Sequence, residues 1–497
     1  MRQKLIDKNK NVEEPVLKPK NSKSLPENDF PSLSQLLFNK EISIEDWKLG
    51  LKEHSNTLSN LLINGDYETF QQYMESTSKS LLEMELEVKK ETDSSISLVE
   101  QSDIATIDYK GFLQELLQLA ILIEHSTIPP YLTALYSIKN GTNEWASQVV
   151  RSIAVEEMLH MIMVCNVMNA MDIQPSVNAP ENYPVYPMQL PLNVDFYVGL
   201  EKFSQNSVST FISIESPTSP LVEAPVYQDP LMGVKLFGIE EIARTDGHWN
   251  IKNLEEYIKM YVNTIGEFYD LVFFFIVLFQ ALDYYRTTGK WPSSFEEINT
   301  GGIFKGNPKK QIRPEQYYGS GGKLHTVESL KGVIEVFEEI KGQGEGADGT
   351  VFSVDPSQFG EGFELAHYFR FKEIFHEHLY SGGDYKPFMD KDGMMPVSTP
   401  PVGNELLIDW SAVYPIKSNF KIEEVSSNAS LSRMVNEFNK TYKKLLDAIQ
   451  HAVEGKHEEL EKSIIIMYAL KEQAVNLMRQ PLSSVENAAP TFEYPID

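Results

Sequence analysis

Residues 153–171 read IAVEEMLHMIMVCNVMNAM, an apolar stretch that carries a glutamate, Glu157, and a histidine, His160, three positions later. Positions three apart share one face of an α-helix, so these two side chains can reach one metal ion together. Apolar residues follow the same face at helical spacing, namely Val150, Ile153, Met161, Val164 and Met168. Because a helix normally buries such a stripe, the stretch predicts a core helix with a carboxylate–imidazole pair inside the protein.

Three other helical segments also place a glutamate on an apolar face. Glu124 lies among Leu117, Ala120, Ile121 and Ile128, and Glu267 among Met260, Leu271, Phe274, Phe275 and Leu278. Glu364 is followed three residues later by His367, with Tyr368, Phe371, Ile374 and Phe375 on the same stripe. Two single glutamates and two Glu-x-x-His pairs, one set per helix, form the ligand set of a dimetal site in a four-helix bundle.

Metal ions explain why carboxylates occur on faces that should be buried. An ionised carboxylate buried without a partner costs several kcal/mol, and four converging carboxylates would repel one another. Two divalent cations would balance four such charges. Oxygen and imidazole ligands without a thiolate favour iron or manganese over zinc-finger or iron–sulfur chemistry. We therefore expect two iron ions, with manganese or a mixed iron–manganese pair as the alternative.

Glu-x-x-His spacing is weak evidence when it occurs once. The chain contains four such pairs, and about one is expected by chance. We expect Glu373 with His376, and Glu454 with His457, to lie on the surface, because Glu373 would be half a turn away from Glu364 on one helix. The metal-site prediction rests on the four segments together.

Several of these stretches resemble a known family. LLQLAILIEHSTIPPYLTALYSI (residues 116–138) and IAVEEMLHMIMVCNVMNAM are similar to the ferritin-like family typified by iminophenyl-pyruvate dimer synthases of violacein- and rebeccamycin-type pathways. TIGEFYDLV (264–272) and ELAHYFRFKEI (364–374) resemble it more weakly. The similarity covers about residues 110–380. It implies a mainly α, ferritin-like four-helix bundle, and it implies that the metal ligands are Glu124, Glu157, His160, Glu267, Glu364 and His367. By analogy with the bundle class, Glu157 and Glu364 would bridge the metals, and Glu124 and Glu267 would be terminal.

The resemblance also implies the chemistry. We expect a non-haem diiron oxidase or oxygenase that uses O2 as co-substrate on a small, amino-acid-derived or secondary-metabolite substrate, with the same six residues as its catalytic group. An external electron donor is compatible with this reaction. Three alternatives stay open: oxidative coupling of an imine of an aromatic 2-oxo acid, iron storage, and a scaffold protein that no longer turns over substrate.

Composition limits the partners. The net charge of −27 argues against nucleic acid and against an anionic membrane surface. The single cysteine, Cys165, cannot form a disulfide within the chain, and the Lys-rich start has no apolar signal segment. The apolar run at residues 271–282 is too short to span a bilayer. We expect a cytoplasmic protein with a small-molecule substrate, which is compatible with a homo-oligomer.

Composition along the chain predicts four regions. Residues 1–29 are expected to form a disordered tail, residues 30–105 an accessory helical region, residues 106–385 the dimetal bundle, and residues 386–497 a loop and a C-terminal helical hairpin. The predicted bundle helices are 109–129 with a continuation past Pro129 and Pro130, 144–171, 253–287 and 360–380. Two long connections, 172–250 and 288–357, are expected either to roof the site or only to decorate the bundle. Asn166, Asn169 and Asp270 are candidate partners of the metal ligands.

Overall fold

The computed structural model describes residues 109–217, 258–259, 262–289, 295–317, 321–345, 365–380 and 400–496. The predicted tail, the accessory helical region and Glu364 lie outside the described residues, as do residues 386–399 of the loop that was expected to begin at residue 386. Within the described part the protein is mainly helical, and its only β pairings are isolated bridges. This agrees with the predicted all-helical bundle.

Two long helices form the centre of the molecule. α5 (Tyr109–Ser137) and α6 (Glu144–Ala170) pack along each other, and most of their residues are buried. By length and composition, α6 is apolar enough to cross a membrane. However, 94% of its apolar eighteen-residue stretch is buried inside the structure. The same burial is expected of a core helix, so its apolar character is explained by packing against neighbouring helices.

α5 runs through the Pro129–Pro130 pair, where a kink was predicted from sequence. A proline inside a helix has no N–H to donate, and Pro130 therefore leaves the carbonyl of Ser126 without its helical partner. The hydroxyl of Tyr186 donates to that carbonyl at 2.9 Å. The connection after α6 thus satisfies a backbone group that the proline released.

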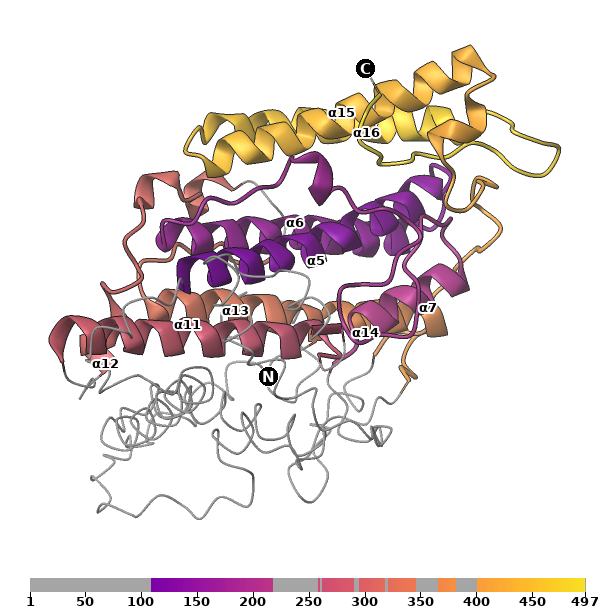
Figure 1. The fold of residues 1–497 in the computed structure, drawn as a ribbon. Coiled ribbons are helices and arrows are strands. Elements are labelled where there is room, and N and C mark those ends of the chain that lie inside the picture. The colour runs from indigo at the N-terminus through magenta and orange to yellow at the C-terminus, as the bar shows by residue number, and fades with distance from the viewer. Residues whose placement is uncertain are drawn as a thin grey trace, which may run out of the picture.

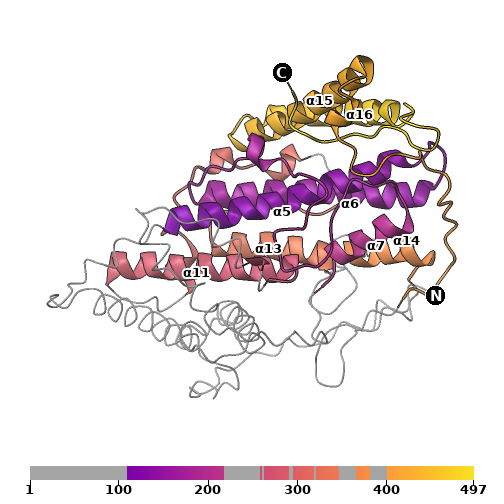
Figure 2. The ribbon, with the colours of Figure 1, turned by 45° about the vertical axis from the view of Figure 1, so that its right-hand side comes forward.

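The helices form three layers, with α5 and α6 in the middle (Figure 1). On one side lie α11 (Ile265–Thr288) beside α13 (Leu330–Glu345), and α7 (Gln205–Ile214) beside α14 (His367–His376). The second view keeps this order, with α7 and α14 placed beyond the ends of α11 and α13 (Figure 2). Four shorter helices therefore make the layer that covers one side of α5 and α6.

The C-terminal hairpin makes the third layer. α15 (Ala429–Val453) and α16 (Glu458–Leu477) pack on each other and against α5 and α6, on the side away from α11 (Figure 1). The sequence predicts the two helices of this hairpin at about residues 430–453 and 456–479, close to the bounds observed. One continuous hydrophobic core runs through all three layers. The remaining short helical elements of the described chain are α12 (Phe295–Asn299), η2 (Pro180–Asn182), η3 (Pro308–Lys310), η4 (Pro314–Gln316) and η5 (Ile422–Val425).

Three predictions about helices were wrong. The described chain is not helical at residues 262–264, so the helix predicted at 253–287 is interrupted and α11 begins at Ile265. The helix predicted at 360–380 begins at His367, after an extended Ala366. The connection predicted as irregular at 172–250 contains α7. In the connection at 288–357, a short helix or strands were expected around LKGVIEVFEEI, and the sixteen-residue α13 lies there.

Candidate metal centre

Glu157 lies at the centre of the candidate site. Its side chain projects from α6 and is 2% exposed. Oε1 lies 2.9 Å from Nδ1 of His367 and 3.8 Å from Nδ1 of His160, and Oε2 accepts a hydrogen bond from the Thr127 hydroxyl at 2.9 Å. The two imidazole rings are nearly parallel, with centroids 5.7 Å apart. One carboxylate is therefore positioned between two histidines from different helices.

Two carboxylates complete the site, one beside each histidine. Oε2 of Glu124, on α5, is 3.3 Å from Nδ1 of His160. Oε2 of Glu215, the residue that ends α7, is 3.5 Å from Nδ1 of His367. We call Glu124 with His160 the His160 half-site, and Glu215 with His367 the His367 half-site; both share Glu157. Each half-site together with Glu157 offers three ligand atoms that lie within 4.8 Å of one another.

This donor set fits two metal ions. Ligand bonds of about 2.0–2.2 Å place neighbouring nitrogen and oxygen ligands roughly 3–4 Å apart, as they are here. Among the described residues, Oε1 of Glu157 and Nδ1 of His367 are buried without a hydrogen bond of acceptable geometry, although they lie 2.9 Å apart. Two buried polar atoms that face each other without a shared proton are the arrangement that a cation between them would satisfy.

The electrostatics of the site also favour cations. Burial, with the neighbouring charge of Glu215, raises the pKa of Glu157 to about 7. Burial alone would lower the pKa of His160, but the hydrogen bond to Glu124 and the charges of Glu157 and Glu124 raise it to about 9. The carboxylates thus gather positive charge in the form of protons, and a divalent metal would replace those protons.

Glu267, a predicted ligand, does not reach this site. Its Oε2 accepts hydrogen bonds from the backbone N–H of Asn263 at 2.8 Å and from the Asn263 side chain at 2.9 Å. Its own N–H donates to the Thr264 hydroxyl at 3.1 Å. Thr264-x-x-Glu267 is therefore a capping arrangement that starts α11. The sequence carried this signal, because Ser or Thr followed three residues later by Glu is typical of a helix N-terminus.

Of the predicted ligands, the structure brings Glu124, Glu157, His160 and His367 together. Glu364 lies outside the described residues, and the argument that it shares a helical face with His367 fails because residues 365 and 366 are not helical. Glu215 stands in the site instead, and sequence reasoning missed it. Its only signal was weak: a glutamate directly after the apolar face of α7, which carries Val208, Phe211 and Ile214.

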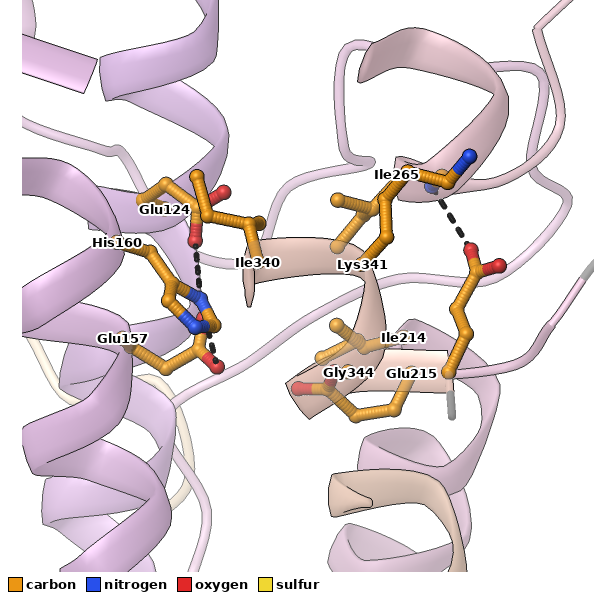
Figure 3. A pocket seen from close by; sticks show the side chains of 11 residues that line it. Glu124, Glu157, His160, Ile214, Glu215, Ile265, Ile340, Lys341 and Gly344 are labelled. Carbon is orange, nitrogen blue, oxygen red and sulfur yellow. Dashed lines mark hydrogen bonds and ion pairs between the residues drawn. The ribbon is translucent and has the colours of Figure 1, made fainter. Parts of the chain in front are cut away.

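A small pocket adjoins both half-sites. Figure 3 shows Glu124, Glu157 and His160 on one side of it, and residues of the two long connections on the other side. Its lining includes Ile214 from the first connection, and Ile340 and Lys341 from α13 in the second. The described parts of both connections therefore shape the space beside the site, as one of the two sequence interpretations expected.

The candidate partners of the ligands have other roles. Asn166 bonds to the backbone of Ile312 and His325, and Asn169 donates to the carbonyl of Val453, so both attach loops to α6. Asp270 pairs with Lys341 at 2.5 Å. Glu373 was predicted to lie on the surface, but it is 5% exposed and accepts a hydrogen bond from the N–H of Tyr380.

The partners of the ligands are instead two tyrosines and two side chains behind the histidines. Tyr269 donates to Oε1 of Glu124 at 2.5 Å, and Tyr131 donates to Oε1 of Glu215 at 2.5 Å. Burial, strengthened by nearby carboxylates, raises the pKa of both phenols well above their usual value, so both remain protonated donors. Behind the histidines lie Gln343 and Glu156.

A family model described as ferritin-like matches residues 117–376, which is slightly more than half of the chain. The chain belongs to the ferritin-like family. A crystal structure of a ferritin-like protein from Caulobacter vibrioides is similar over 76% of this chain and 97% of that chain, with 18% sequence identity and a TM-score of 0.43. No curated protein matches the sequence.

Proposed function

We propose that this protein is a non-haem dimetal oxidoreductase, with iron as the metal, that acts with O2 on a small organic substrate. The observation that supports it most directly is the position of Glu157 between two histidine–glutamate half-sites. Glu157 would bridge the two ions, Glu124 and His160 would hold one, and Glu215 and His367 the other. The bound metals would supply the redox chemistry, as in other carboxylate-bridged bundles.

The protein's own contribution is a dry and fixed ligand set. All five ligands are at most 3% exposed, and each terminal carboxylate has one oxygen held by a tyrosine. Excluding water strengthens electrostatic interactions inside the site and protects reactive species from side reactions. The adjoining pocket, lined partly by Ile214, Ile265 and Ile340, offers an apolar wall to a small substrate.

We propose only the chemical class of the substrate. The family resemblance suggests a small, amino-acid-derived molecule, and the closer alternative is oxidative coupling of an imine of an aromatic 2-oxo acid. The apolar wall formed by Ile214, Ile265 and Ile340 does not distinguish between these substrates. Aerobic turnover of the ferrous protein with candidate 2-imino or amino acids, followed by mass spectrometry of the products, separates the two.

The first experiment is metal content per chain after anaerobic purification, measured by mass spectrometry. The wild type should hold about two irons per chain, as expected for a carboxylate-bridged bundle site. Glu215→Gln should lower this number, because it removes a ligand charge from the His367 half-site. Glu267→Gln is the matched control and should leave metal content unchanged, because Glu267 caps α11.

Two other results would reject the proposal. A protein that binds no metal after reconstitution would leave a scaffold role on a ferritin-like fold. Accumulation of a large ferric mineral without any organic product would indicate iron storage. Loss of metal in Glu267→Gln, with full content in Glu215→Gln, would show that the ligand set inferred from the sequence is right and the one described above is wrong.

A further inference from the structure

The two half-sites are built from the same series of side chains. Tyr269, Glu124 and His160 follow one another in the first, and Tyr131, Glu215 and His367 in the second. In both, the tyrosine holds Oε1 of the glutamate, and Oε2 faces Nδ1 of the histidine. In both, Nε2 of the histidine points to a buried partner behind the ring. The half-sites differ in the chemistry of that last partner, and also in the distance from Nδ1 to Oε1 of Glu157, which is 2.9 Å for His367 and 3.8 Å for His160.

His160 has a neutral partner. Its Nε2 lies 2.7 Å from Oε1 of Gln343. The amide nitrogen of Gln343 donates to Oε1 of Glu339 at 2.9 Å, which leaves the amide oxygen to accept from His160. The charge of Glu339 therefore reaches His160 only through an intervening amide. With a metal bound, Nε2 would carry the proton that Gln343 accepts, and Nδ1 would present its lone pair to the ion.

His367 has an anionic partner. Its Nε2 lies 2.7 Å from Oε2 of Glu156, which can only accept. Arg370 also donates to Glu156 from both terminal nitrogens and to the hydroxyl of Ser152 at 3.0 Å. Glu156 is 1% exposed, so this charged carboxylate is held inside the protein by His367 and Arg370. Arginine keeps the carboxylate ionised and fixes its direction, which makes Glu156 a stronger acceptor than a neutral amide.

One short segment covers both partners. Gly321 and Gly322 have positive φ angles, +85° and +71°, which favour glycine. A Cβ at Gly321 would collide with the carboxylate of Glu156, and one at Gly322 would collide with the amide of Gln343. The glycine pair therefore packs directly on the two residues that distinguish the half-sites, and this contact restricts their movement.

We propose that Glu156 and Gln343 are positioning residues that make the two metal positions unequal, so that the His367 half-site binds its divalent ion first and more tightly. The inference rests on the dimetal site proposed above. A carboxylate that accepts from the far nitrogen of a ligating imidazole orients the ring and raises its basicity, and losing such a partner weakens metal binding about 10–100-fold. An amide orients the ring but adds no charge.

The test is a titration of metal-free protein with Co²⁺, followed by its visible absorption and by calorimetry. The wild type should show two binding events of different affinity. His367→Ala should lose the tighter event and His160→Ala the weaker one. Glu156→Gln keeps the size of the side chain and should weaken the tighter event about 10–100-fold, leaving the other within a few-fold. Gln343→Ala is the matched variant and should weaken only the second event.

The outcomes distinguish failure of the proposed inequality from failure of the dimetal site. Two equal events in the wild type, or equal weakening of both by Glu156→Gln, would overturn the inequality while the dimetal site stands. Fewer than two ions in the wild type would overturn the dimetal site itself. Circular dichroism of each variant checks its fold. If Glu156→Gln does not fold, the two histidine variants still test the proposal. Retention of the tighter binding event in His367→Ala would reject it.

Discussion

Two adjacent glutamates on α6 show how the surroundings of a side chain decide its charge. Burial and the charge of Glu215 raise the pKa of Glu157 to about 7. Burial would also raise the pKa of Glu156, but Arg370 and His367 lower it to about 2. Consecutive residues of one helix point about 100° apart, so they meet different neighbours. Glu157 is thereby available as a proposed ligand, while Glu156 stays an anion held behind the ring of His367.

Glu373 provides a test of buried charge outside the proposed ligand set. Burial raises its pKa to about 7 from its usual value of 4.5. The folded state then binds more protons than the unfolded state between these two values, so the contribution of Glu373 to stability is complete below about pH 4.5 and is lost as pH rises through 7. The loss amounts to about 3 kcal/mol at most.

Glu373→Gln removes this titration and keeps an oxygen for the N–H of Tyr380. Urea unfolding of metal-free protein at several pH values should show that the variant gains stability relative to the wild type as pH rises from about 5 to 8. Other carboxyl groups titrate in both proteins, so the difference between the two curves is the quantity to compare. A difference that is constant with pH would show that Glu373 is already ionised in the folded protein at pH 5.

At the scale of elements, the positions of several important side chains depend on helix ends rather than on helix faces. α7, α11 and α14 place their important residues at a terminus: Glu215 ends α7, Glu267 caps α11, and His367 begins α14. Helical periodicity describes the interior of a helix and says little about its ends, where backbone groups need other partners. This is why Glu124, Glu157 and His160, inside α5 and α6, could be predicted, whereas the position of Glu215 and the capping role of Glu267 could not.

The N-terminus of α15 allows the contribution of a helix cap to stability to be measured. The side chain of Asn428 accepts a hydrogen bond from the N–H of Leu431 at 3.1 Å. Asn428→Ala should lower the free energy of unfolding by about 1 kcal/mol, because it leaves one N–H of the first turn without this acceptor. Asn428→Asp keeps the acceptor and should stay close to the wild type in denaturant unfolding. Equal losses in both variants would mean that the cap does not stabilise the hairpin.

At the scale of the molecule, the C-terminal hairpin covers the side of α5 and α6 that faces away from the proposed metals (Figure 2). Phe438 of α15 is fully buried and packs edge to face on Phe492, with ring centroids 4.9 Å apart. The continuous core implies that the hairpin and the bundle unfold together.

Phe438→Ala should therefore destabilise the whole described fold by about 3–5 kcal/mol, because it removes buried surface and leaves a cavity. Phe438→Leu should cost less. Guanidinium unfolding followed by helix content and by tyrosine and tryptophan fluorescence should show one shared transition at a lower midpoint. Separate transitions for the two signals would indicate that the hairpin is an independent unit. Metal content of the folded variant should match the wild type.

The sequence by itself determined the helical class, the two central helices, the C-terminal hairpin, and three of the proposed ligands, which lie inside α5 and α6. These features depend on local spacing along one helix, which apolar periodicity records directly. His367 was also found, although its predicted helical pairing with Glu364 was not. Only the tertiary structure decided the rest: that Glu215 comes from a short helix in a crossover, that Glu267 turns to its own helix end, and that Glu156 and Gln343 stand behind the histidines. Those contacts join segments that are far apart in the chain, and the apolar periodicity of one segment gives no information about them.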